Sequence, residues 1–491
     1  MIRKLKVLFT HSYFLKFDAK QFKTAMPYPP LGTLYAMSYL REHGYDVKLF
    51  DTMFCTSAKD IYSTIDSYQP DIFVSYDDGF NYLTKMCLTN MREACFDMQA
   101  YAKSKGCKVI TSSSDAADHY NDYLNHGADA IAIGEAEQTV LELCNAFKNK
   151  LDFKLISGIA YLNSDLSVSL SPKRSVIKDL DTLPPPAWDL IDVSEYKTMW
   201  IQNHGYFSLN FVTTRGCPYK CNWCAKPIYG NRYNSHSPQN SVLEIKKWQQ
   251  KFGFTHVWFA DDIFGLKPNW LKEFEYHIAK ENVVIDYKIQ SRADLLLEED
   301  NIEHLAKSGC KTVWMGAESG SQKILDAMDK GTKVEQIYEA TKLLKKHHIH
   351  VALFLQLGYL EETIEDIQLT IKMVEDLLPD DIGISVSYPL PGTVFYDKVK
   401  DQLKEKSNWT DSDDLDLLFK NTYKKEFYKQ LQRYIHKRYR KKIGFRSLSK
   451  LSSEFNTKNL KNSLALLHLI PGEKIERNKL VIIEPSVKAF L

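Results

Sequence analysis

Three cysteines stand close together, directly after an apolar, β-branched run. The segment FVTTRGCPYKCNWCAKPIYG, residues 211–230, places Cys217, Cys221 and Cys224 in a C-x3-C-x2-C array. Iron–sulfur clusters are held by thiolates, normally four, and thiolates prefer soft metal centres. Because no fourth cysteine lies nearby, the spacing indicates a cubane cluster on three cysteines, with one iron left open to an exogenous ligand.

Two other interpretations of the triplet remain open. A structural zinc site could be completed by His236, or the three cysteines could be buried core residues. Zinc sites usually pair one C-x2-C knuckle with a second knuckle further along the chain. No second knuckle follows here, so the pattern favours the cluster.

The segment CPYKCNWC resembles the motif of the radical S-adenosylmethionine (SAM) enzymes, CxxxCxΦC with an aromatic residue at Φ, and Trp223 fills that position. The resemblance implies that the open iron of a 4Fe-4S cluster chelates the amino and carboxylate groups of SAM. It also implies that an electron from the cluster cleaves SAM to a 5′-deoxyadenosyl radical. Such chemistry needs a low potential, and hence an external electron donor of the flavodoxin or ferredoxin type.

Composition limits the classes of protein to which the chain can belong. Its 491 residues are too many for one ordinary core, and 44% hydrophobic with 26% charged residues is typical of a globular protein. The net charge of +2 does not favour a nucleic-acid partner. Nine unevenly spread cysteines do not form a disulfide framework, and no apolar run reaches the length of a membrane span. We therefore expect a cytoplasmic protein, with Cys55, Cys87, Cys95, Cys107, Cys144 and Cys310 buried as small hydrophobes.

Residues 1–150 alternate short apolar runs with segments of helical periodicity. The runs KVLFTHS, DVKLFDT, DIFVSYDD, CKVITSSS and DAIAIGE predict five strands of a doubly wound parallel sheet. Ligands of such folds bind at the carboxyl ends of the strands. The candidate binding residues there are Ser75, Ser112, Ser113, Gly134 and Glu135, with Tyr76 and Ser114 beside them.

The run PYPPLGTLYAMSYLREHGYDVKLFD and the later IGEAEQT resemble the N-terminal cobalamin-binding domain of one large class of radical SAM enzymes. The histidine motif DxHxxG of other cobalamin domains is absent, and DAADHY does not match it. The resemblance therefore implies cobalamin held without a lower protein ligand. The alternatives are that this domain binds nothing or has become a substrate cap.

A linker and a second domain follow. Residues 151–205 predict a hairpin turning at 163–165 and then a proline-rich connection, LDTLPPPAWDL. Residues 206–400 repeat strand and helix six times, with strands SLNFVTTR, HVWFADD, IDYKIQSR, TVWMGAES, HVALFLQLG and DIGISVSYP. The expected fold is a partial (β/α)6 TIM-like barrel with its site at the carboxyl ends of the strands.

Polar residues end each of these strands, and we expect them to face the cluster. They are Arg215, Asp261, Asp262, Ser291, Arg292, Glu318, Ser319, Gln356, Gly358 and Tyr388. Arg292 suits a carboxylate because guanidinium offers a bidentate fork, and Glu318 with Ser319 suits ribose hydroxyls or the amino group. The resemblance agrees, since FADDIF, MGAESGSQKIL and QLGYLEET match the SAM-contacting strand ends, although Tyr359–Leu360 departs from the commoner GxPGET form. The alternative for a strand-end Asp is a helix N-cap.

The tail from 401 to 491 is expected to be mainly helical and basic. Nine Lys or Arg and no acid lie between Phe427 and Ser453, with Phe427, Leu431, Tyr434 and Tyr439 at near-helical spacing. This pattern predicts packing on the barrel. A basic helix can also contact anionic lipid at a membrane surface, whereas a solvated face is the commoner outcome. The last segment, LALLHLIPGEKIERNKLVIIEPS, predicts a short helix and a strand.

The leading functional hypothesis is a cobalamin-dependent radical SAM enzyme that methylates an unactivated carbon of a small molecule. The resemblance equally allows radical oxidation or ring closure, as in the anaerobic magnesium-protoporphyrin ester cyclases, which share this layout. A tRNA methylthiotransferase is disfavoured because a second three-cysteine site is missing. The non-enzymatic alternative is a metal-stabilised scaffold. The identity of the substrate does not follow from the sequence.

Overall fold

The computed structural model describes residues 5–86, 88–224, 228–404, 406–453 and 455–490. These residues form two compact units. Unit 1 comprises residues 1–219, 225–287 and 408–414, and unit 2 comprises residues 220–224, 288–407 and 415–491. The boundaries between these units differ from the predicted domain boundaries at 150, 205 and 400. The predicted domain boundaries stay predictions.

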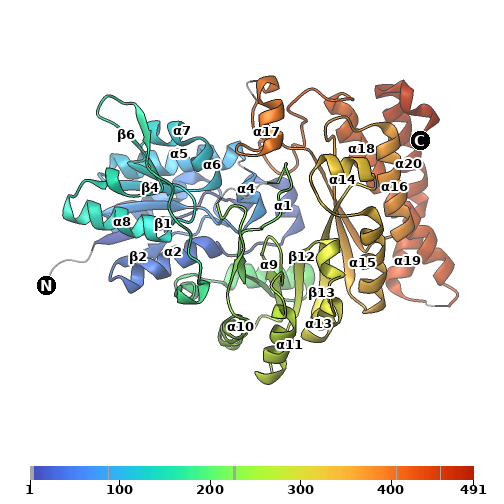
Figure 1. The fold of residues 1–491 in the computed structure, drawn as a ribbon, viewed down its shortest axis with the longest axis horizontal. Helices are drawn as coiled ribbons and strands as arrows, with labels where there is room; N and C mark the ends of the chain where they lie inside the picture. Colours follow the sequence, from blue (N-terminus) through green and yellow to red (C-terminus); the bar gives the residue numbers. More distant parts are fainter. Residues whose placement is uncertain (1–4, 87, 225–227, 405, 454, 491) are drawn as a thin grey trace. The chain divides into compact units, whose positions relative to one another are not determined.

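A seven-stranded sheet forms the N-terminal part of unit 1 (Figure 1), in the order β2-β1-β3-β4-β5-β6-β7. Strands β1 to β5 pair in parallel, and β6 and β7 add an antiparallel hairpin at the edge. The bounds are β1 (Lys6–Thr10), β2 (Asp46–Leu49), β3 (Ile72–Tyr76), β4 (Lys108–Ser112), β5 (Ala130–Ala132), β6 (Ile159–Leu162) and β7 (Val168–Leu170). All five predicted strands and the predicted hairpin are confirmed.

Helices cover both faces of this sheet, with α2 and α8 on one side and α5 and α7 on the other (Figure 1). Residues of β3 are buried along the whole strand, as a sheet covered on two faces requires. The helices are α1 (Ala19–Thr24), α2 (Leu31–Glu42), α3 (Tyr62–Tyr68), α4 (Tyr82–Lys85), α5 (Thr89–Ser104), α6 (Ser114–Asp118), α7 (Tyr120–Asn125) and α8 (Glu137–Asn149), with 3₁₀ turns η1 (Leu15–Phe17), η2 (Ala58–Ile61) and η3 (Phe153–Leu155).

Unit 1 continues with the proline-rich segment and the start of the second sheet. These elements are η4 (Leu180–Thr182), η5 (Trp188–Leu190), α9 (Ser194–His204), β8 (Ser208–Phe211), β9 (Thr214–Arg215), β10 (Asn234–Ser235), α10 (Pro238–Phe252), β11 (His256–Phe259) and α11 (Trp270–Lys280). Helix α10 begins where the hydroxyl of Ser237 caps it and Pro238 occupies its first turn. It ends at Gly253, whose φ of +69° suits glycine.

Residues 408–414 return to unit 1 late in the chain. The amide of Thr89 donates to the carbonyl of Trp409 at 3.0 Å. Arg92 donates to Asn408 at 2.9 Å, and the amide and hydroxyl of Ser412 donate to Asp18 at 3.1 and 2.9 Å. A short segment of the tail is thus part of the N-terminal unit.

The second sheet has the strand order β15-β14-β13-β12-β11-β8, which follows the chain. The pairs β8–β11, β13–β14 and β14–β15 are parallel, so the predicted α/β class with parallel sheets is confirmed. The remaining strands and helices up to the tail are β12 (Asp286–Ser291), α12 (Ala293–Leu296), α13 (Asn301–Ser308), β13 (Cys310–Glu318), α14 (Gln322–Ala327), α15 (Val334–Lys346), β14 (His350–Leu357), α16 (Ile364–Leu377), β15 (Asp381–Val386), α17 (Val394–Val399) and η6 (Lys400–Gln402).

The tail is helical, with α18 (Lys425–Lys450), α19 (Thr457–Leu464), α20 (Leu466–Ile483) and η7 (Pro485–Ala489). The predicted inward face of α18 is confirmed, because Phe427, Leu431, Tyr434 and Tyr439 are buried and the hydroxyl of Tyr439 donates to the carbonyl of Pro379 at 2.8 Å. The predicted terminal strand is wrong. Residues 480–483 complete α20, which continues through Pro471.

The cysteines outside the triplet largely follow the prediction. Cys95, Cys107, Cys144 and Cys310 are buried, and Cys55 is half-buried. Burial raises the pKa of the Cys55 and Cys107 thiols to about 11. Cys87 lies outside the described residues.

Candidate functional site

The cysteine loop begins at a position that only glycine can occupy. Gly216 has a φ of +83°, and a Cβ there would lie 2.4 Å from the carbonyl oxygen of Arg232. The next residue, Cys217, is buried, and its amide donates to the carbonyl of Gly230 at 3.4 Å. The close backbone approach therefore fixes the first cysteine of the triplet within unit 1.

Asn222 holds the other half of the loop within unit 2. Its amide donates to the carbonyl of Met328 at 3.0 Å, and its side chain donates to the carbonyl of Ala327 and to Asp329, both at 2.8 Å. The hydroxyl of Tyr359 donates to the Asn222 Oδ1 at 2.8 Å. Sequence reasoning missed Asn222, which occupies a free position of the motif. Tyr359, which departs from the commoner turn form, thus supports the cysteine loop directly.

Arg292 lies beside Cys221. Its Nη1 is 3.8 Å from the Cys221 Sγ, and its Nε and Nη2 donate to the two oxygens of Asp294 at 3.0 and 2.8 Å. Ser291, the preceding residue at the end of β12, is buried.

Glu318 and Lys330 form a buried ion pair at the end of β13. The Lys330 Nζ lies 2.9 Å from the Glu318 Oε1, and both side chains are less than 10% exposed. Glu318 has a φ of +58°, rare for a residue with a side chain, where the β13–β14 register shifts after Gly316. Burial by itself would lower the pKa of Lys330, but the neighbouring carboxylate of Glu318 and the thiol of Cys221 hold this pKa above its usual value.

The predicted residues that follow Glu318 in unit 2 mostly bond to neighbouring protein groups. The Ser319 hydroxyl lies 3.1 Å from that of Thr370, and Gln356 donates to Ser387 at 2.9 Å. The amide of Gly358 donates to Glu362 at 2.7 Å. Glu362, which the sequence reasoning did not single out, is fully buried, and burial raises its pKa to about 8. Tyr388 is buried after β15.

Asp261 organises the strand-to-loop turn that leads to Cys217. It accepts hydrogen bonds from the amides and the hydroxyls of both Thr213 and Thr214, at 2.6 to 3.1 Å. Burial raises its pKa to about 7. Asp262 instead lies 2.6 Å from the Lys85 Nζ. Asp261 is therefore a support of the turn.

Arg215 turns its side chain toward two carboxylates of the N-terminal sheet domain. Its Nη1 lies 2.5 Å from Glu135 and its Nη2 lies 2.7 Å from Glu137, and all three side chains are buried. The rings of Tyr35, Phe80 and Tyr229 surround the guanidinium, with centroids 5.4 to 5.7 Å from its carbon. Glu135, a predicted cofactor contact, thus pairs with Arg215. Glu137, its equal partner at the start of α8, was missed.

The carboxyl edge of the N-terminal sheet combines satisfied and unsatisfied polar groups. Ser75 lies 3.2 Å from the Cys95 sulfur, Ser113 caps α6, and Ser112 is buried. Gly134 has a φ of +84°. Among the described residues, the buried atoms Ser114 Oγ, Glu137 Oε2 and Thr139 Oγ1 have no hydrogen-bond partner. Such atoms are costly unless a ligand or water satisfies them.

The described part of the chain omits residues 225–227 beside Cys224. Within it, no three His, Cys, Asp or Glu side chains are gathered closely enough to hold a metal ion. His236 would be the fourth ligand in the zinc alternative. Its Nδ1 lies 3.1 Å from the carboxylate of Asp181. The thiol set and the cation beside Cys221 fit an iron–sulfur cluster chemically.

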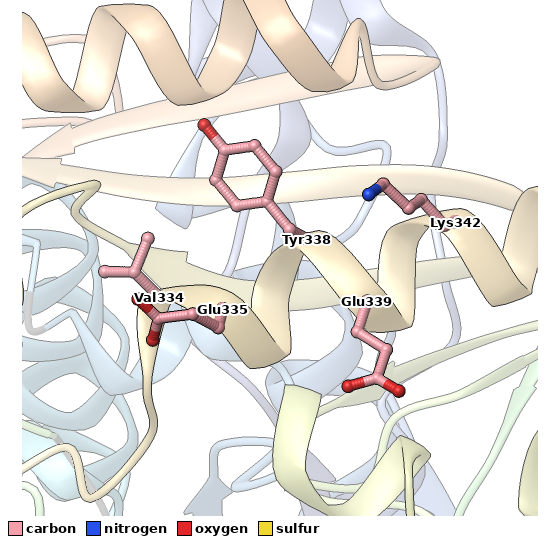
Figure 2. A pocket seen from close by; sticks show the side chains of 5 residues that line it. All are labelled: Val334, Glu335, Tyr338, Glu339 and Lys342. Atoms are coloured by element: carbon pink, nitrogen blue, oxygen red, sulfur yellow. The ribbon is translucent and has the colours of Figure 1, made fainter.

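A surface depression in unit 2 is lined by none of these residues. It measures about 510 Å³ and lies along one face of α15, lined by Val334, Glu335, Tyr338, Glu339 and Lys342 (Figure 2). Tyr338 donates to Asp376 at 3.0 Å. No predicted site residue lines this depression.

Comparisons with known proteins place this loop in a family. The radical SAM superfamily model matches residues 211–374. An uncharacterized methyltransferase of Pyrococcus horikoshii is 28% identical over 78% of this chain and 81% of its own length. The anaerobic magnesium-protoporphyrin IX monomethyl ester cyclase of Rubrivivax gelatinosus is 26% identical over 82% of this chain and 71% of its own.

A solved structure extends the likeness of fold to nearly the whole chain. The cobalamin-dependent SAM radical enzyme OxsB, with aqua-cobalamin and SAM bound, has a TM-score of 0.75 at 17% identity over 98% of this chain and 73% of its own. At that identity the likeness concerns the fold. Residues 211–374, with their cysteine motif, form a radical SAM domain.

Proposed function

We propose that the chain is a cobalamin-dependent radical SAM methyltransferase that acts on an unactivated carbon of a small molecule. The proposal rests on one observation. The same chain contains the three-cysteine domain and a parallel sheet whose carboxyl edge has buried polar atoms without hydrogen-bond partners. The fold likeness to a structure holding cobalamin and SAM supports it. So does the relative named as a methyltransferase. In this proposal the six-stranded sheet serves as the predicted partial barrel.

Cys217, Cys221 and Cys224 would hold the 4Fe-4S cluster. When bound, the cluster supplies the electron that cleaves SAM, and a flavodoxin- or ferredoxin-type donor would restore it. The chain itself fixes the loop through Gly216 and Asn222, and it places the Arg292 guanidinium 3.8 Å from the Cys221 sulfur. The indole Nε1 of Trp223 is buried without a partner among the described residues, so it is a free donor beside the cysteines.

SAM would bind to unit 2 residues that are already paired. Arg292 would present its fork to the carboxylate after leaving Asp294, because a guanidinium binds carboxylates in the same bidentate way. Glu318 would accept from ribose hydroxyls while Lys330 keeps its charge compensated. Ser319, Gln356 and Gly358 would support these groups through their hydrogen bonds. The contact predicted for Asp262, which lies in unit 1 and pairs with Lys85, stays a prediction.

Cobalamin would occupy the carboxyl edge of the N-terminal sheet. Polar atoms of the cofactor can satisfy the buried Ser114 Oγ and Thr139 Oγ1. Cobalamin supplies the methyl group to be transferred. Five predicted residues would shape this edge, chiefly through hydrogen bonds to other protein groups. They are Ser75, Ser112, Ser113, Gly134 and Glu135.

A second candidate is a radical oxidative cyclase of the same class. The specific observation in its favour is the 26% identity to the Rubrivivax gelatinosus cyclase over most of both chains. The two candidates share the cofactors and differ in the product, because only the methyltransferase adds a methyl group to the substrate.

Anaerobic reconstitution with iron, sulfide and hydroxocobalamin tests the proposal. We expect iron and cobalamin to remain after desalting, and dithionite to drive cleavage of SAM. Cys217→Ala, Cys221→Ala and Cys224→Ala should each abolish iron retention and cleavage, whereas Cys55→Ala should retain both. Loss of cobalamin on desalting would overturn the cobalamin half, and cleavage by the cysteine variants would overturn the cluster. Labelled methyl groups from SAM, followed by mass spectrometry of products, separate methylation from cyclisation.

A further inference from the structure

The two last helices of the tail form one almost continuous rod. Between α19 and α20, Ala465 keeps right-handed helical angles, φ −61° and ψ −21°. The hydrogen-bond ladder also runs on, because Ala465 donates to the Lys461 carbonyl and Leu469 donates to the Ala465 carbonyl, at 3.0 and 2.9 Å. Side chains from 457 to 483 can therefore be placed on one helical surface.

An exposed apolar stripe runs along this rod. At the helical spacing of about 100° per residue, an arc of about 80° over about 33 Å holds the exposed Asn478 and six apolar residues. The six apolar residues are Leu460, Leu464, Leu467, Pro471, Ile475 and Ile482. The five aliphatic side chains among them are 37% to 81% exposed. An ordered apolar row of this length in contact with water indicates an interaction surface.

Lysines border the stripe, whereas the acids point away from it. Lys461 and Lys479 lie along one border and Lys474 along the other, all exposed. The two acids within the described rod, Glu473 and Glu476, contact α18, and Glu476 also lies 3.4 Å from the border residue Lys479. Glu473 lies 2.8 Å from Lys441, and Glu476 accepts from Gln430 at 2.6 Å. The outward face is therefore mainly apolar, interrupted by Asn478, with Lys461 and Lys474 on opposite borders and Lys479 paired with Glu476.

We propose that the α19–α20 stripe docks on an anionic lipid surface. An apolar stripe flanked by lysines is the pattern of helices that lie in a membrane interface. Among the described residues no helix is long and apolar enough to cross a bilayer, so the helix lies on the surface. A second copy of the chain is disfavoured as the occupant, because it would bring the same lysine borders together.

Co-sedimentation of the full chain with lipid vesicles tests this. The chain should bind vesicles of phosphatidylcholine with 30% phosphatidylglycerol at least about tenfold more tightly than pure phosphatidylcholine, and added salt should weaken the binding. Replacing Leu464, Leu467 and Ile475 by Asn should abolish it, and Lys461→Glu with Lys474→Glu and Lys479→Glu should reduce it by more than about tenfold.

A matched control replaces exposed apolar residues elsewhere. Leu155, Leu166 and Val284 are 77% to 88% exposed, and their replacement by Asn should leave vesicle binding unchanged. Circular dichroism verifies that every variant is folded. Absence of binding by the wild-type chain overturns the proposal. So does light scattering that shows a dimer abolished by the stripe variants, which would make the stripe a contact between copies.

Discussion

The guanidinium of Arg215 lies 2.7 Å from the carboxylate of Glu137, 78 residues earlier in the chain. Arg215 stands two residues before the first cysteine of the triplet, and Glu137 opens helix α8 of the N-terminal sheet domain. Together with Glu135, the pair links the cysteine loop to the domain proposed to hold cobalamin. Both ends of this link belong to unit 1.

Replacing Arg215 by Met should destabilise unit 1 by about 3–5 kcal/mol, because two carboxylates would remain buried without a cation. Calorimetry should show a lower transition temperature. The triple variant Arg215→Met, Glu135→Gln, Glu137→Gln should recover most of the loss. Arg41→Met, which removes an exposed pair with Asp189, should cost no more than about 1 kcal/mol. An unaltered transition in Arg215→Met would show that the pair contributes nothing.

Replacing Asp261 by Asn should loosen the turn before Cys217, because the amide nitrogen cannot accept the hydrogen bonds that Thr213 and Thr214 donate. We expect a loss of about 1–3 kcal/mol and less iron retained per chain after reconstitution. Iron analysis and thermal unfolding measure the two effects. Asp189→Asn, at an exposed position, serves as the control. Full iron retention by Asp261→Asn would contradict the supporting role.

Replacing Lys330 by Met should leave Glu318 as an unpaired buried carboxylate and cost about 3–5 kcal/mol. The double variant Lys330→Met, Glu318→Gln should recover part of this loss, since it removes both charges. Chemical denaturation of the single and double variants gives the coupling free energy. Strictly additive effects would mean that the 2.9 Å contact has no energetic weight.

Glu362 should make stability depend on pH. Burial raises its pKa from 4.5 to about 8, so between these values the folded chain keeps a proton that the unfolded chain loses. The free energy of unfolding should therefore fall as pH rises from about 4.5 to about 8, by up to about 5 kcal/mol for this group. Unfolding at several pH values measures the slope. Glu362→Gln should remove this contribution and the exposed control Glu361→Gln should keep it. An identical slope in Glu362→Gln would refute the assignment.

Periodicity and motif spacing predicted much of this molecule. The apolar runs predicted the parallel strands because buried strands and amphipathic helices carry different patterns. The spacing of the three cysteines predicted the cysteine loop, because thiols that share one metal centre often lie a few residues apart in the sequence. The partners of Arg215 were not predictable, since nothing local distinguishes a strand-end arginine that faces a cluster from one paired with distant carboxylates. Asn222 and Glu362 were missed for the same reason. The role of Asn222 arises from partners more than a hundred residues away. That of Glu362 arises from burial, to which the tail contributes.

The continuation of α20 through Pro471 illustrates a different limit. Proline and glycine together normally end a helix, so Pro471 and Gly472 favoured a break and a following strand. Packing against α18 outweighs that local preference, because Leu466, Leu469 and Leu480 are buried along the inner face of the rod.

The interleaving of the two units has a consequence for how the chain is made. The polypeptide passes from one unit to the other at 219/220, 224/225, 287/288, 407/408 and 414/415. Asp18 and Thr89 therefore acquire their partners Ser412 and Trp409 only after the ribosome has added more than three hundred further residues. Unit 1 can begin to fold early in synthesis, but its last segment, residues 408–414, is added only near the end of synthesis. Cleavage of the chain at one site releases neither unit intact.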